Sequence, residues 1–161
     1  MFTNERTLFA FLYGYSRMLV ADLPDEKMTA QPAGIVNHPA WVLGHLVNTV
    51  DSGLKLLGAS PLMPPEWAVK YGRGSMPVAD RSAYPSKDEL MAALETSHGK
   101  LAMAAETATP EVVSAINPFE RNRPFFPTVG ILVAHIMTTH ESMHLGQLST
   151  WRRAMGFPGV L

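Results

Sequence analysis

Apolar residues recur every three to four positions along four long stretches of the chain, a spacing typical of amphipathic α-helices. The predicted helices cover about 4–22, 37–58, 86–107 and 128–155. In the first, the predicted apolar face consists of Leu8, Phe11, Leu12, Tyr15 and Leu19. No stretch alternates apolar and polar residues for long, so strands are at most minor. Such helices must bury their apolar faces against one another, which predicts an all-α four-helix bundle with long connecting loops.

Two of the predicted helices carry recognisable start signals. Ser86 and Glu89 form the S-x-x-E pattern of a capping box, in which the serine and glutamate side chains each bond a free backbone N–H. At the second helix, Asn37 or His38 can cap, and Pro39 is tolerated in the first turn because its missing N–H would be unpaired there. These signals predict starts near residues 38 and 86.

The connection over about 59–85 is unusually long for a loop within a compact domain, and such loops commonly cover functional sites. It contains Trp67 and Tyr71 among several prolines. This composition predicts an ordered flap whose two aromatic side chains line a pocket. The chain length of 161 residues predicts one domain spanning 1–161.

Composition excludes several classes of function. The net charge of −1 gives no electrostatic footprint for nucleic acid, and the basic pairs Arg121/Arg123 and Arg152/Arg153 are expected to lie on the solvated surface. The sequence contains no run of about 18 apolar residues, so no membrane span is expected. There is no cysteine, which excludes disulfides, thiolate metal sites and a cysteine nucleophile, and is consistent with a cytoplasmic protein.

The segment "HESMHLGQ" near the end of the chain contains the richest chemistry. His140 and His144 are four residues apart, so on a helix they project from one face and can bind one metal ion, with Gln147 on the same side. Read literally, the segment is H-E-x-x-H, a metalloprotease signature in which Glu141 would be the general base. Glu141 points about 100° away from the histidine face, which favours an ordinary helix residue.

A catalytic zinc site commonly takes a third protein ligand. The 17 residues after His144 contain no His, Asp or Glu, so this ligand must come from upstream, which argues against the common protease classes. His45 is the best candidate because it lies in the middle of an apolar predicted helix, where a polar side chain needs a partner. Trp41, one turn earlier, is a candidate for the wall of the same pocket.

The other histidines fit the site less well. His38 has a sufficient role as a cap or surface residue, and His98 is expected on the polar side of its helix. His135 is five residues before His140, about 140° around an α-helix, so it is not expected on the same face. The residues alone leave an alternative open, in which His140 and His144 are surface residues and His45 is a satisfied core residue.

The segments "NHPAWVLGHLVNTVDSGLKLLG" and "LVAHIMTTHESMHLGQLSTWRRAMGFP" resemble the DinB-like (damage-inducible) metal-binding four-helix-bundle superfamily. The resemblance implies His45, His140 and His144 as ligands of one divalent metal, usually zinc or nickel, and a chain that pairs as a homodimer. The family includes bacillithiol- and mycothiol-dependent transferases and isomerases.

That resemblance favours a metal-dependent transferase acting on a small molecule with a low-molecular-weight thiol, or a hydrolase using the same metal. Gln147 could then bond a ligand or a metal-bound water, and a role in helix packing is an equal alternative. A non-catalytic stress or binding protein, whose metal only stabilises the bundle, is a second hypothesis of a different class. The H-E-x-x-H metalloprotease is a third and weaker one.

Overall fold

The computed structural model describes residues 1–161, and the fold is an all-α bundle, as predicted. Its long elements are α1 (Thr3–Val20), α2 (Pro39–Leu56), α4 (Lys87–Thr107) and a fourth rod made of α6 (Val129–His135), the π-helical turn η5 (Ile136–His140) and α7 (Glu141–Ala154). The remaining elements are η1 (Asp25–Lys27), η2 (Pro32–Gly34), α3 (Glu66–Tyr71), η3 (Arg81–Ala83), α5 (Pro110–Ser114) and η4 (Glu120–Asn122). One isolated β-bridge, between Ile116 and Thr128, is the sole extended pairing.

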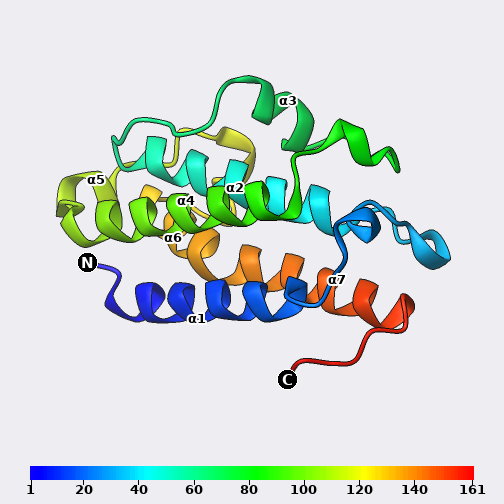
Figure 1. Cartoon of the computed structure of the whole chain (residues 1–161). Helices are drawn as coiled ribbons and strands as arrows, with labels where there is room; N and C mark the ends of the chain where they lie inside the picture. The colour runs from blue at the N-terminus through cyan, green and yellow to red at the C-terminus, as the bar shows by residue number, and fades with distance from the viewer.

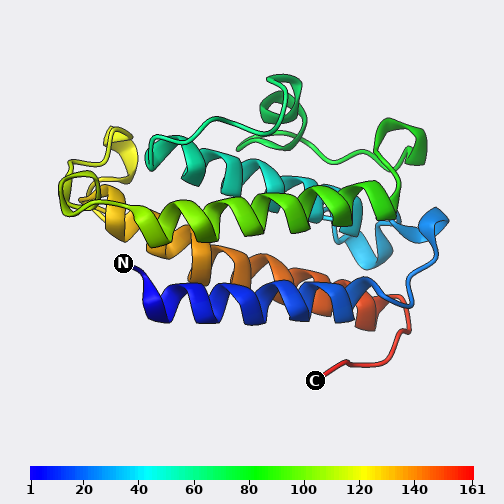
Figure 2. The same ribbon diagram turned by 60° about the vertical axis from the view of Figure 1, so that its left-hand side comes forward.

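The four rods form a ring in which α1 packs on α4, α4 on α2, α2 on α7 and α7 on α1. Along the chain, α1 and the α6–α7 rod run in one direction, while α2 and α4 run in the other (Figures 1 and 2). Because α2 and α4 are neighbours that run in parallel, the chain must return along the whole bundle between them. This geometry accounts for the long connection that the sequence places there.

Both start signals in the sequence operate in the structure. The capping box of α4 is complete, with Ser86 and Glu89 bonding each other's backbone N–H groups. His38, rather than Asn37, caps α2: its Nδ1 accepts a hydrogen bond from Trp41 N at 3.2 Å. His38 is fully buried and also donates from Nε2 to the carbonyl of Val78, so the surface role considered for it was wrong.

The return segment, residues 57–86, is ordered and lies along α2, as the flap prediction required (Figure 1). Side chains along α2 hold it by hydrogen bonds. Asp51 accepts from the backbone N of Leu62 at 2.5 Å, and His45 donates to the carbonyl of Tyr71 at 2.6 Å. Nearer the start of α2, Trp41 donates to Ser75 Oγ at 2.9 Å. The segment is therefore a fixed wall against the face of α2 that carries His45.

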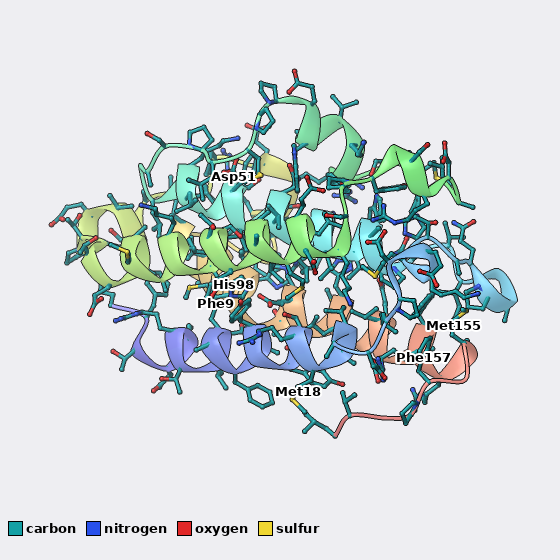
Figure 3. All side chains as sticks on the ribbon, in the orientation of Figure 1. Phe9, Met18, Asp51, His98, Met155 and Phe157 are labelled. Carbon is teal, nitrogen blue, oxygen red and sulfur yellow. The ribbon has the colours of Figure 1, made fainter.

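The apolar face of α1 differs in part from the predicted one. Phe9, Leu12 and Leu19 are buried, whereas Leu8 and Phe11 are 52% and 58% exposed. Met18, also exposed, points outward from α1 in Figure 3. Leucine and phenylalanine occur on both sides of this helix, so periodicity alone did not identify the side that faces the bundle.

One predicted surface arginine is a core residue. Arg152 is 1% exposed, and its guanidinium donates to Asp22 and to the carbonyl of Leu19, joining the end of α7 to the end of α1. The expectation of a solvated Arg152/Arg153 pair was therefore wrong for its first member, although Arg153 is exposed. None of the helices is both long enough and apolar enough to cross a bilayer.

Candidate metal centre

Three histidines from two facing helices meet inside the bundle. One ring nitrogen of each of His45, His140 and His144 lies within 4.8 Å of those of the other two. The closest pair, His45 Nε2 and His140 Nε2, is separated by 3.3 Å. Imidazole nitrogens bind zinc at about 2.0–2.1 Å, so the nitrogens of one site lie a few ångström apart, as they do here. The structure thus brings together the three residues that the sequence singled out.

The ring of His45 is oriented by the return segment. Its Nδ1 donates to the carbonyl of Tyr71 at 2.6 Å, and a carbonyl can only accept, so the proton is on Nδ1. The lone pair is then on Nε2, which faces the other two histidines. A backbone carbonyl behind a histidine is the arrangement that orients metal-binding imidazoles in proteins. The Trp41 indole stacks on the His45 ring, with the two ring centroids 4.7 Å apart.

The Tyr71 carbonyl can approach His45 because the preceding residue of α2 is Gly44, which leaves room for the Tyr71 ring. A Cβ built on Gly44 would lie 2.1 Å from the Tyr71 ring, which is buried with 1% of its surface exposed. The aromatic ring of Tyr71 therefore packs on the helix while its carbonyl accepts from His45. The role of Tyr71 is different from the predicted one, since its backbone contacts the site and its ring is in the core. Trp67 packs on Tyr71 at 4.8 Å and is not one of the residues that line the cavity beside the histidines.

Gly44→Ala is expected to lower the free energy of unfolding by about 1–3 kcal/mol, because an overpacked core must shift its neighbours. The displaced Tyr71 carbonyl would also release His45, so metal affinity should fall. Gly99→Ala is the matched control, since Gly99 lies in α4 with no atom near its added Cβ. Urea unfolding and metal titration of both variants measure the effect, and an unchanged metal affinity in Gly44→Ala would contradict it.

The ring of His144 is oriented from the opposite side. Its Nδ1 lies 3.1 Å from Gln147 Oε1, and the same oxygen accepts from Asn37 Nδ2 at 3.1 Å. An oxygen that accepts from Asn37 also accepts the Nδ1 proton of His144, leaving Nε2 as the free nitrogen. Gln147 therefore contacts a candidate ligand directly, in line with one of its two predicted roles. The sequence predicts Asn37 only as a possible cap of α2, and no local pattern marks its contact with Gln147.

Gln147→Ala is expected to weaken metal binding by about tenfold. Loss of a side chain that orients a metal ligand typically lowers affinity by about 10- to 100-fold, and the smaller value is expected because Gln147 is exposed. Gln147→Glu keeps an acceptor for His144 and should retain affinity. Thr150→Ala is the control, because Thr150 bonds only its own helix at the carbonyl of Gly146. A competition titration against a chelator gives the three affinities, and equal values for Gln147→Ala and Thr150→Ala would rule out this role.

His135 is not one of the three converging residues, as predicted, but its ring lies closer to the cluster than the α-helical angle implied. The intervening turn, Ile136–His140, is π-helical, and residues five apart on such a wide turn come round to nearly the same side. The centroids of His135 and His140 are consequently 5.7 Å apart. His135 stacks on Phe126 at 4.2 Å, and its Nδ1 lies 2.5 Å from Thr139 Oγ1. The angle assumed from an ideal α-helix was wrong because the helix is locally wider.

Glu141 points away from the three histidines. Its carboxylate is 1% exposed and lies 3.1 Å from His98 Nε2, between α7 and α4. His98 in turn stacks on Phe9 of α1 at 3.7 Å (Figure 3). The predicted place of His98 on a polar helix side was therefore wrong. Burial raises the pKa of Glu141, and the neighbouring His98 acts in the opposite direction. A general base for peptide hydrolysis is thus missing from the histidine cluster.

A cavity of about 310 Å³ opens beside the cluster, at the lower end of the size range of small-molecule sites. His45 and His140 form part of its wall, so a molecule in the cavity can reach the nitrogens that face each other. The rest of the wall comes from α2, the return segment, the loop around η4, α6 and the first residue of η5. These residues are Asn48, Thr49, Ser52, Leu56, Arg73, Phe119, Asn122, Phe126, Leu132, His135 and Ile136.

Burial keeps the histidines neutral. It lowers the pKa of His140 to about 3 and that of His144 to about 4, and the mutual repulsion of the charged rings adds to the effect. The pKa of His45 is lowered by burial as well. Neutral imidazoles with a free nitrogen are the form that binds metals.

These lowered pKa values predict how the stability of the metal-free protein depends on pH. The unfolded chain takes up protons on these histidines below about 6.5, while the folded chain resists until about 4 and 3. The contribution of these histidines to the free energy of unfolding is therefore fully present above pH 6.5. It is lost as the pH falls below that value, by up to about 1.4 kcal/mol per pH unit for each histidine. Urea unfolding at several pH values should show a smaller slope for His140→Ala/His144→Ala than for wild type. Parallel slopes would contradict the prediction.

Three imidazoles that converge from facing helices could hold a metal ion. This arrangement is typical of helical bundles that build a metal site from side chains on facing helices. The sequence model of the DinB superfamily matches residues 9–148. The chain belongs to the DinB superfamily. Comparison with curated proteins and with solved structures found no match.

Proposed function

We propose that this protein is a metal-dependent transferase, in which His45, His140 and His144 bind one divalent metal ion, zinc or nickel, and a low-molecular-weight thiol is the nucleophile. The observation that carries the proposal is the convergence of three neutral imidazole nitrogens beside a cavity. A divalent metal held by three neutral ligands keeps its full charge, and it favours deprotonation of a thiol or water that reaches it.

The chain's own residues support a nucleophile supplied from solution. There is no cysteine, and no Asp or Glu lines the cavity. Tyr71 and Gln147 orient His45 and His144, and the return segment closes one side of the site. In the proposed reaction the thiol sulfur forms a bond to an electrophilic carbon as a leaving group departs, or adds to an activated double bond. A hydrolase would use water in the same place.

The test begins with metal content of protein prepared without added metal, for wild type and His45→Ala. Metal-loaded wild type is then incubated with a panel of small thiols and electrophiles, and the loss of free thiol and the appearance of conjugate are measured. Metal-stripped wild type is the control. Hydrolysis of the same electrophiles without thiol would indicate the hydrolase. Bound metal with neither reaction would favour the non-catalytic alternative.

We also propose a homodimer, which the family resemblance implies, and a cytoplasmic location, with which the absence of cysteine is consistent. The outward face of α1 exposes Leu8, Phe11 and Met18, which is where a second copy could pack. The mass in solution by light scattering tests the dimer, and Phe11→Glu should reduce it to a monomer if this face is used. Cell fractionation tests the location.

A further inference from the structure

The cavity beside the histidines is lined by a single permanently charged side chain, Arg73. It follows Tyr71 in the return segment and comes from neither of the two helices that hold the histidines. Its guanidinium makes no hydrogen bond and no ion pair with any other residue. An arginine without a partner at a cavity wall has its donors available to a ligand.

The position of Arg73 is held from both sides. Tyr71, two residues earlier, accepts from His45 at 2.6 Å. Ser75, two residues later, accepts from the Trp41 indole at 2.9 Å. Because Trp41 also stacks on His45, both anchors belong to the wall of the metal centre. Arg73 is thus fixed in the segment that faces the site, although its side chain is exposed.

The other polar groups of the wall are neutral. Asn48, Thr49 and Asn122 line the cavity, and their side chains form no hydrogen bond within the protein. No acidic residue neutralises Arg73, and the metal proposed at the histidines would add positive charge nearby. Phe119 and Phe126 supply apolar surface. A positive, partly apolar cavity of about 310 Å³ suits a small anion.

We infer that this cavity binds a small molecule that carries a carboxylate, with Arg73 as the residue that binds the carboxylate while the reacting group of the same molecule lies at the histidines. The inference rests on the proposed function, because it assigns the substrate class of that same site. Arginine is suited to this role, since its planar fork matches the two oxygens of a carboxylate. Arg73 is a specificity residue here and takes no part in bond making.

The test uses cobalt-loaded protein, in which a bound thiol changes the visible absorption. Titration with mercaptopropionate and with mercaptopropanol compares two thiols of the same chain length that differ in charge. Wild type is expected to prefer the carboxylate by about tenfold, and Arg73→Gln to reduce that preference to about twofold or less. Arg153→Gln is the matched control, because it removes the same charge from an exposed arginine in the last turn of α7, outside the cavity.

The outcomes separate this inference from the proposed function. An equal preference in wild type and Arg73→Gln, or no preference in wild type, overturns the role of Arg73 while leaving thiol binding intact. If neither thiol binds, the thiol-transfer proposal fails. Propionate and propionamide are then compared by calorimetry on the same metal-loaded proteins. A preference for propionate that Arg73→Gln removes would sustain the carboxylate site, and equal binding would refute it.

Discussion

His140→Ala is expected to reduce bound metal from about one ion per chain to close to none. His140 Nε2 is 3.3 Å from His45 Nε2 and belongs to the same rod as His144, so it links the two helices of the site. Two remaining imidazoles cannot complete a three-ligand site, and the loss should exceed the 10- to 100-fold effect of a supporting group, roughly a thousandfold or more.

His135→Ala is the matched control for this loss. His135 is on the same rod, its ring centroid is 5.7 Å from that of His140, and it also lines the cavity. It is not one of the three residues whose nitrogens converge, so its replacement should leave metal content unchanged. Metal analysis of both purified variants, with circular dichroism to confirm folding, decides the matter. Equal losses would mean that the site has a different set of ligands.

Glu141→Ala is expected to lower the free energy of unfolding by about 1–3 kcal/mol, because it leaves the buried His98 imidazole without its polar neighbour. The carboxylate and the His98 imidazole are both nearly inaccessible, and His98 is stacked on Phe9, so it cannot turn to solvent. Folded Glu141→Ala should still bind metal, because the carboxylate faces away from the three histidines. Chemical denaturation and metal analysis measure the two properties separately.

Further variants separate a structural role of Glu141 from a catalytic one. Glu26→Ala, at an exposed glutamate without an ion pair, should change stability by less than about 0.5 kcal/mol. The double variant Glu141→Leu/His98→Leu should recover much of the loss, since apolar residues of similar size commonly replace a buried pair. A peptidase activity in wild type that Glu141→Gln abolishes would restore the protease hypothesis.

The bundle was largely predictable because its evidence is local. Helical periodicity, the capping box at Ser86 and the spacing of His140 and His144 depend on residues close together in the chain. The third histidine, His45, was predicted as the best upstream candidate because the chain after His144 offers no ligand and His45 lies in an apolar helix, and the family resemblance implied the same residue. Short-range geometry also predicted that Glu141 would point away from the histidine face.

The errors arose where local geometry is modified by the rest of the fold. His135 was misplaced because a π-helical turn changes the angle between residues five apart. His98 was misplaced because α4 has neighbours on two sides, α1 and α2, so a polar residue between them can be buried if a partner such as Glu141 reaches it. Leu8 and Phe11 were assigned to the core although the side that α1 presents to the bundle is decided by packing.

The sequence by itself determined that the chain forms amphipathic helices, that it has no cysteine chemistry, and that two histidines lie on one helix face. Only the tertiary structure decided what surrounds them: the carbonyl of Tyr71 behind His45, the Asn37–Gln147 contact beside His144, and Arg73 at the cavity wall. The physical reason is the parallel arrangement of α2 and α4, which forces the return segment along α2. A contact between residues so far apart in the chain leaves no periodic signal in the sequence.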